Sequence, residues 1–300
     1  MLYDTDRSRL LARVKAALGA EAGERIAPLI RPTIGFAAAP VSSGRSKLGG
    51  LPDLPEAVDW PTRSVTPRPP SFLERLMGKR PPPPAMRPLP FLAQIALDEI
   101  PAQHLDLQLP RSGVLYFFYD PDSFAWGFSP EDRAAWKVIY AAEPGQPREM
   151  PETDQSEVFG EVALRPTPGW ITPPHDYRSA PGAPVLTPEE ADALAEAIDD
   201  DEAEPPPEVR LGGWPMLIQN DIQSEAQLAS NGVDTLSGPD HARGEALLAE
   251  AWRWRLLLEI GSVDAAGMMW GDVGSLYFQM RDDDLAAGRW DRAWMALQCS

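Results

Sequence analysis

A repeat constrains the fold of this chain more than any other feature of its sequence. Three blocks recur in the same order, namely 47–52 with 210–215, 91–95 with 256–260, and 113–117 with 274–278. The offset between matching leucines is 163 in the first block (211 − 48), 165 in the second (257 − 92) and 161 in the third (276 − 115). A period of this length is too long for a solenoid and predicts a doubled subdomain. The seam, where the two halves meet, is then the natural place for a cleft.

The apolar pattern around these blocks predicts an α+β fold of two similar, mostly antiparallel, β-rich halves with peripheral helices and long proline-rich loops. Apolar residues at helical spacing predict an N-terminal amphipathic helix within residues 1–30. Alternating and aromatic apolar runs predict strands inside each repeat. We therefore expect four parts: the N-terminal helix over 1–30, a first half-repeat over 31–145, an irregular linker with an acidic helix over 146–208, and a second half-repeat over 209–300.

Residues 61–90 differ from the rest of the first half. Ten of these thirty residues are proline and six are basic, whereas Glu74 is the only acidic residue. Proline cannot donate a backbone hydrogen bond to a sheet, so we expect an exposed insertion with polyproline character. A long loop that belongs to its own domain explains such a segment, and docking on an anionic partner is the functional alternative.

The chain is strongly acidic, with 45 Asp and Glu against 27 Lys and Arg, a formal net charge of −18 and a pI near 4.6. This charge repels phosphate backbones and anionic lipids, so nucleic acid and membrane surfaces are not expected partners. A basic protein fits better, although solubility alone also explains the charge. The N-terminus has no secretory apolar core, and no apolar run reaches the ~18 residues of a membrane span. We expect a cytoplasmic protein.

The acidic charge is densest in residues 189–208, which contain ten Asp or Glu and no Lys or Arg. The segment begins at Thr187 and Pro188, and Glu190 has the spacing that completes a capping box. Four carboxylates spaced three to four residues apart, from Glu189 to Asp199, would line one helix face. Asp200 and Asp201 follow directly after them. The candidates for binding a basic partner are Glu196, Asp199, Asp200 and Asp201.

Few residues suggest chemistry. The single cysteine and three scattered histidines predict no metal site, cofactor or catalytic group. Gln94 and Glu259 each place a polar side chain in an apolar strand, where burial requires a partner. Arg255 and Asp272 are candidate partners of Glu259 at the seam, and two carboxylates there could perform acid–base work if their pKa values differ. For Asp272, which lies between two glycines, turn preference favours the other alternative, a solvent-facing carboxylate.

Several blocks together resemble the YwqG-like family of bacterial proteins of unknown function. The resemblance is carried by Ser46-Lys47-Leu48-Gly49-Gly50-Leu51-Pro52, Pro90-Phe91-Leu92-Ala93-Gln94-Ile95, Leu211-Gly212-Gly213-Trp214-Pro215 and Trp270-Gly271-Asp272-Val273-Gly274. It spans about residues 30 to 300, and it implies an α+β fold and a bacterial cytoplasmic setting but no catalytic residues. We expect a non-enzymatic protein that binds a partner through its acidic surface, such as an immunity or toxin-neutralising factor. The alternative is a small-molecule-binding protein or hydrolase with its site at the seam.

Overall fold

A computed structural model describes residues 1–40, 44–66, 76–77, 80, 83–152, 158–174, 177–197, 205–235 and 241–300. Within these residues the main sheet has eleven strands, and every neighbouring pair in it is antiparallel. The order is β13-β12-β11-β10-β2-β9-β3-β6-β7-β8, with β1 also paired to β9. The strands are β1 (Tyr3–Asp4), β2 (Arg31–Ala39), β3 (Lys47–Leu48), β6 (Phe91–Ala96), β7 (Val114–Tyr119), β8 (Trp136–Ala141), β9 (Val162–Ile171), β10 (Val209–Leu211), β11 (Trp254–Gly261), β12 (Ser275–Arg281) and β13 (Trp294–Gln298).

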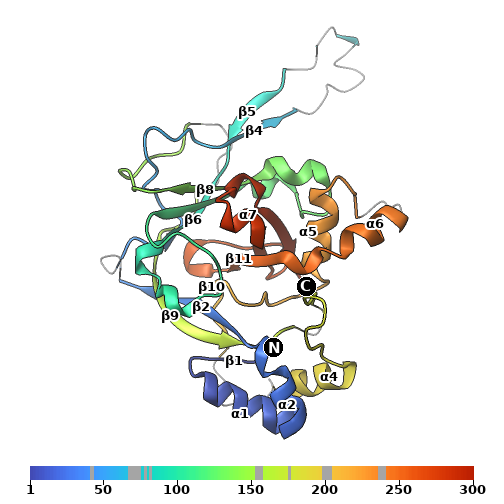
Figure 1. Cartoon of the computed structure of the whole chain (residues 1–300). Helices are drawn as coiled ribbons and strands as arrows, with labels where there is room; N and C mark the ends of the chain where they lie inside the picture. Colours follow the sequence, from blue (N-terminus) through green and yellow to red (C-terminus); the bar gives the residue numbers. More distant parts are fainter. Residues whose placement is uncertain are drawn as a thin grey trace.

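The strand order places the two repeats on opposite sides of a central pair, β2 and β9 (Figure 1). The first arm is β3, β6, β7 and β8, and the second arm is β10, β11, β12 and β13. Each arm has its β-bulge at the matched leucine, Leu92 in β6 and Leu257 in β11. Matching strands therefore occupy mirrored places in the sheet order.

The sheet curls until its two ends approach each other and form a nearly closed barrel. Trp136 in β8 donates from Nε1 to Ala293 O beside β13 (3.1 Å), and Trp294 in β13 donates from Nε1 to Gly127 O (2.8 Å). The two indole rings pack edge to face, with 5.1 Å between their centroids. One hydrophobic core thus extends through both arms.

Strand β9 lies in the range 146–208 that the sequence predicts to be irregular, and there that prediction is wrong. It pairs along nine consecutive positions with β2 despite Pro166 and Pro168. On its other edge, the paired positions in the described residues are 162–163 with β3 and 170–171 with β1. Both prolines lie between those stretches, where a missing N–H costs no ladder hydrogen bond.

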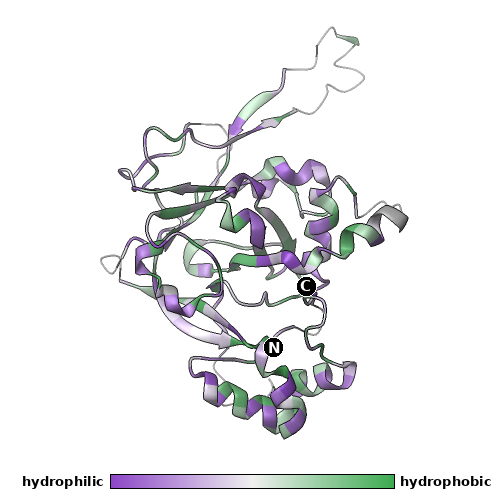
Figure 2. Ribbon diagram, in the orientation of Figure 1, coloured by the Kyte–Doolittle hydropathy of each residue, from purple (hydrophilic) through white to green (hydrophobic). Residues whose placement is uncertain are grey.

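The helices lie at the periphery of the barrel, as the sequence predicts. Helices α1 (Arg7–Leu18), α2 (Ala20–Ile26) and α4 (Pro188–Glu196) gather at one end, where each carries both hydrophilic and hydrophobic residues (Figures 1 and 2). Their apolar residues form a second core cluster with Trp214. The other described helices are α5 (Ile222–Ser230), α6 (His241–Leu248) and α7 (Asp282–Ala286). No helix in the described residues is both long and apolar enough to cross a membrane.

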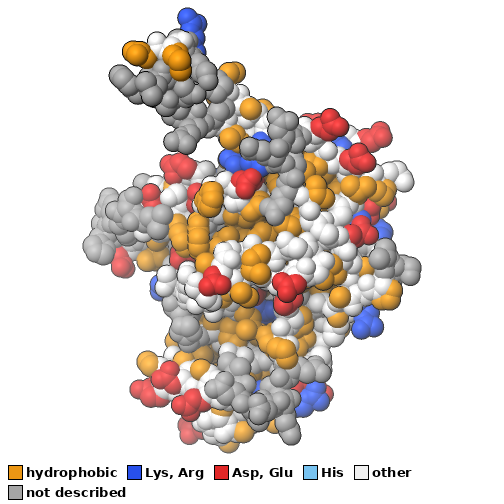
Figure 3. All heavy atoms as spheres, turned by 180° about the vertical axis from the view of Figure 1, so that it is seen from behind, with side chains coloured by type: hydrophobic (Ala, Val, Ile, Leu, Met, Phe, Trp, Pro, Cys, Tyr) orange, Lys and Arg blue, Asp and Glu red, His pale blue; other side chains and the backbone are white. Residues whose placement is uncertain are grey.

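The proline-rich insertion begins and ends as a two-stranded antiparallel ribbon, which corrects the expectation that it could not form a sheet. Strands β4 (Thr62–Val65) and β5 (Ala85–Pro88) pair with each other and project from the barrel (Figures 1 and 3). The base of the ribbon is fixed by Arg63, whose Nε lies 2.5 Å from Oδ2 of the buried Asp120. Residues 67–75, 78–79 and 81–82 of the insertion lie outside the described part of the chain.

Candidate ligand site at the seam

Glu259 is held inside the second arm by a buried arginine. It faces Arg210 of β10 and Tyr277 of β12 in the strand register, and its Oε2 accepts from Arg210 Nη2 and from Met216 N (3.0 Å). Arg210 also donates from Nη1 to Trp214 O (3.1 Å), and its side chain is fully buried. Burial raises the pKa of Glu259, and the charge of Arg210 opposes that rise. This ion pair fastens the turn 212–216 to the sheet.

In the first arm, the neutral side chain of Gln94 likewise fastens a turn to the sheet. Its Oε1 accepts from Asp53 N (2.8 Å), and its Nε2 donates to Asp53 Oδ2 and Arg45 O (2.7 Å each). Tyr116 donates to Asp53 O (2.6 Å), just as Tyr277 donates to Met216 O (2.5 Å) in the second arm. Gln94 and Glu259 thus occupy matching places in the two arms, and their hydrogen bonds hold backbone turns in place.

Among the hydrogen bonds and ion pairs of the described residues, none joins Arg255 to Glu259. Nη2 of Arg255 binds Oδ2 of Asp106 instead, and Asp106 lies in the connection between β6 and β7 of the first arm. The same carboxylate oxygen lies 3.7 Å from Nε of Arg31, at the start of the central strand β2. A central strand, one arm and a loop from the other arm therefore meet at these three side chains.

The loop that carries Asp106 is packed tightly against the sheet. A Cβ atom at Gly212 would lie 3.1 Å from Leu105 Cδ2 and 3.3 Å from Leu107 Cδ1. Gly212 has a φ of +69°, so it also adopts a backbone conformation that favours glycine. Close approach of this loop thereby explains the first glycine of the Gly-Gly turn.

Within the described residues, the two guanidinium groups share one carboxylate, so two positive charges face a single negative charge. Asp106 is the carboxylate that pairs with both of them within the described residues. Nε of Arg255 is buried without a hydrogen-bond partner there. Arg31 stacks on Trp214, with its Cζ 3.3 Å from the ring centroid. Burial and the charge of Arg255 lower the pKa of Arg31 to about 9, against the opposing effect of Asp106.

Both arginine side chains are mostly buried but keep some exposure to solvent. About a fifth of each guanidinium-bearing side chain is exposed, 20% for Arg31 and 18% for Arg255, and 28% of the Asp106 side chain is exposed. Guanidinium groups present parallel N–H donors that match carboxylate and phosphate oxygens. This point of the fold therefore offers positive charge and donors that suit a small oxyanion.

The other predicted site residues lie elsewhere. Asp272 is exposed in the turn before β12, as the solvent-facing alternative for it predicts, and its backbone oxygen accepts from Ser300 N (3.2 Å). Glu196 is exposed at the end of α4, whereas Asp199, Asp200 and Asp201 lie outside the described residues. The hydrogen bonds and ion pairs of the described residues therefore do not join Arg255, Glu259 and Asp272 to one another.

The sequence marked Arg255 only as a partner of Glu259, and it did not mark Arg31, Asp106 or Arg210 as candidates. Arg210 matches Lys47 in the first repeat block and pairs in register with Glu259, so the repeat itself held that signal. Lys47 is opposite Gln94 and forms its ion pair with Glu161 instead (3.0 Å). Arg31 and Asp106 had no pattern to mark them, because neither lies in a repeat block.

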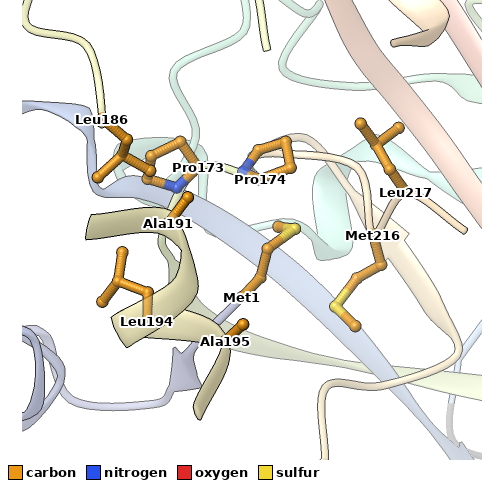
Figure 4. A pocket seen from close by; sticks show the side chains of 9 residues that line it. All are labelled: Met1, Pro173, Pro174, Leu186, Ala191, Leu194, Ala195, Met216 and Leu217. Carbon is orange, nitrogen blue, oxygen red and sulfur yellow. The ribbon is translucent and has the colours of Figure 1, made fainter. Parts of the chain in front are cut away.

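Apolar side chains also enclose a pocket of about 110 Å³ beside α4 (Figure 4). Met1, Leu194 and Met216 contribute to its wall. In the described residues, no group of three or more His, Cys, Asp or Glu side chains could hold a metal ion. The arginine pair and this pocket are thus two separate places where a ligand could bind.

Comparison with known proteins adds a family but no activity. A search of curated proteins found no match. The sequence profile of a domain of unknown function, DUF1963, matches residues 46–299, which include both arms and the central strand β9. The chain therefore belongs to the DUF1963 family.

Proposed function

We propose that this protein is a binding protein whose site lies at the seam and takes a small oxyanion, a carboxylate or a phosphate, between Arg31 and Arg255. The observation that carries the proposal is the buried Nε of Arg255, which has no hydrogen-bond partner among the described residues, beside a second half-buried guanidinium. Leaving buried donors unsatisfied costs free energy that a bound anion would recover. Such a site corresponds to the small-molecule site at the seam that the sequence suggests as the alternative.

The charge of the whole chain affects how an anion can be bound. A net charge of −18 repels anions over long range, so a site for an anion must be built from local contacts. Asp106 already occupies one side of the arginine pair. It acts as an internal competitor, and an incoming anion gains most if it binds the donors that Asp106 leaves free.

The test is a calorimetric titration of the full chain with inorganic phosphate and with acetate at low ionic strength. Arg255→Met keeps the apolar stem and removes the donors, so binding should weaken about tenfold or more, since charged hydrogen bonds contribute about 1.5–3 kcal/mol. Asp106→Asn should tighten binding because it removes the competing charge. Arg253→Met, two residues away and paired with Glu250, is the matched control and should bind like the unmodified protein.

Two results would overturn the proposal. One is the absence of saturable binding of either anion to the unmodified chain. The other is equal affinity in the Arg255→Met and Arg253→Met variants. If Asp106→Asn lowers stability and leaves affinity unchanged, Asp106 serves only to fasten its loop, and the competition is ruled out.

We also propose that the two arms descend from a duplicated unit and that the chain is a YwqG-like protein of the bacterial cytoplasm. The matched bulges, the mirrored strand order and the equivalent roles of Gln94 and Glu259 support the duplication. Leu115 pairs with Ile95 and Tyr140 in the first arm, and Leu276 pairs with Ile260 and Leu297 in the second.

A second candidate function is binding of a basic protein through the acidic helix. Glu189, Asp192 and Glu196 are exposed on α4, and its last turn has no basic residue. The partner would be of the toxin type that an immunity protein neutralises. Neutralising Glu196, Asp199, Asp200 and Asp201 together should slow association with a partner recovered by pull-down and flatten its salt dependence. If association rate depends on ionic strength in the same way for the unmodified and the neutralised protein, the acidic helix takes no part in binding.

A further inference from the structure

The pocket beside α4 shares no lining residue with the arginine pair and is built from four parts of the chain. Leu186, Ala191 and Leu194 contribute from α4 and the residues before it, Pro173 and Pro174 follow β9, and Met216 follows β10 (Figure 4). Met1 reaches into it from the N-terminal end of the described chain. The pocket encloses about 110 Å³.

The chemistry of the lining selects its ligand. Within the described residues, the side chains that line the pocket are aliphatic, proline or methionine. Met1 also carries the terminal ammonium, and burial lowers its pKa to about 6, so this group is mostly uncharged near pH 7. A charged or strongly polar molecule would lose its hydration there and find no side-chain partner. Apolar cavities of about 150 Å³ stay dry and bind benzene or xenon. The lining therefore favours a small, uncharged, apolar molecule.

Packing and the N-terminal cap of α4 hold most of the pocket wall in place. Leu186, Leu194 and Trp214 belong to one buried cluster, and Tyr177 packs edge to face on Trp214 with 5.0 Å between ring centroids. Helix α4 is held at its start by Thr187, whose Oγ1 accepts from Glu190 N (3.2 Å), and by the ion pair of Glu190 with Arg25. Met1 and Met216 are the adaptable part of the wall, because unbranched thioether side chains adjust to irregular shapes.

We infer that this pocket is a second ligand site, which binds a small uncharged apolar molecule about the size of one aromatic ring. It is a different site from the oxyanion site, since none of its lining residues belongs to the arginine pair. Bound ligand lies against α4 and the turn after β10, so it stabilises the docking of α4 on the rest of the chain.

The test uses the full chain, with methyl-labelled methionine and benzene as the probe. Saturable shifts of the Met1 and Met216 methyl signals are expected, together with a rise in thermal midpoint. Benzoate, which has the same ring and a charge, should leave these signals unchanged. Arg255→Met should bind benzene like the unmodified protein, which separates this site from the oxyanion site.

A pair of variants on one helix completes the test. Ala191→Leu fills the pocket and should abolish the benzene shifts, and its own thermal midpoint shows that it is folded. Ala193→Leu makes the same substitution at a position of α4 that does not line the pocket, and it should retain binding. No saturable shift in the unmodified protein, or equal binding in both variants, would overturn the inference.

Discussion

A β-bulge decides which side chains can meet in β11. Arg255 and Glu259 are four residues apart, and in a regular strand that spacing puts both on one face. The register with β12 skips Leu257 between Leu256 and Leu258. This extra residue shifts the alternation of the strand, so Arg255 and Glu259 lie on opposite faces of the sheet. Arg255 therefore reaches Asp106, and Glu259 reaches Arg210. Sequence alternation predicted the strand and its buried polar residue, but not the bulge that separates the pair.

Removing the carboxylate at Glu259 should be strongly destabilising. Glu259→Ala leaves the fully buried Arg210 without its counter-charge, and the expected loss in free energy of unfolding is about 3–5 kcal/mol by denaturant titration. Gln94→Ala removes the equivalent neutral side chain, and it should cost only about 1–3 kcal/mol. Equal losses in the two variants would show that the charge of Arg210 is compensated by another group.

At the scale of elements, the sequence predicted strands well where apolar residues run together and failed where proline interrupts them. Strands β6, β7, β11 and β12 each overlap one of the repeated blocks in which the sequence predicts strands. Strand β9 was missed because Pro166 and Pro168 break its pattern, although tertiary placement makes both prolines harmless. The ribbon of β4 and β5 was missed for the same reason, since Pro88 ends one of its strands.

The ribbon gives a clear test of how the insertion is attached. Removing residues 66–84 and joining Val65 to Ala85 through Asn-Gly keeps the pairing of β4 and β5, because that register suits a two-residue turn. The free energy of unfolding should change by less than about 1 kcal/mol, since loop length has a weak entropic effect. Arg63→Ala is the contrast, because it weakens the pairing of buried Asp120 and should cost about 1–3 kcal/mol. A larger loss from the deletion than from Arg63→Ala would mean that the insertion stabilises the barrel.

On the scale of the whole molecule, the two arms share a single core although each has its own turn and bulge. Phe117 of β7 and Phe278 of β12 are fully buried and pack edge to face, with 5.1 Å between their centroids. Tyr119 and Phe159 both pack on Trp270, which follows β11. The repeat in the sequence predicted two similar halves meeting at a seam. It could not reveal that aromatic residues from both halves fill that seam, because such contacts depend on how the sheet curls.

This shared core predicts that neither arm unfolds alone. Phe278→Ala should cost about 3–5 kcal/mol, because it opens a cavity against Phe117 in the other arm. Hydrogen exchange should then accelerate to the same extent in β7 and in β12, since both report one global unfolding event. Met269→Ala, at a half-exposed side chain in the turn after β11, is the control and should leave exchange in both strands nearly unchanged. Faster exchange confined to β12 would show that the second arm opens by itself, and the aromatic contacts across the seam would then add little to the cooperativity of the barrel.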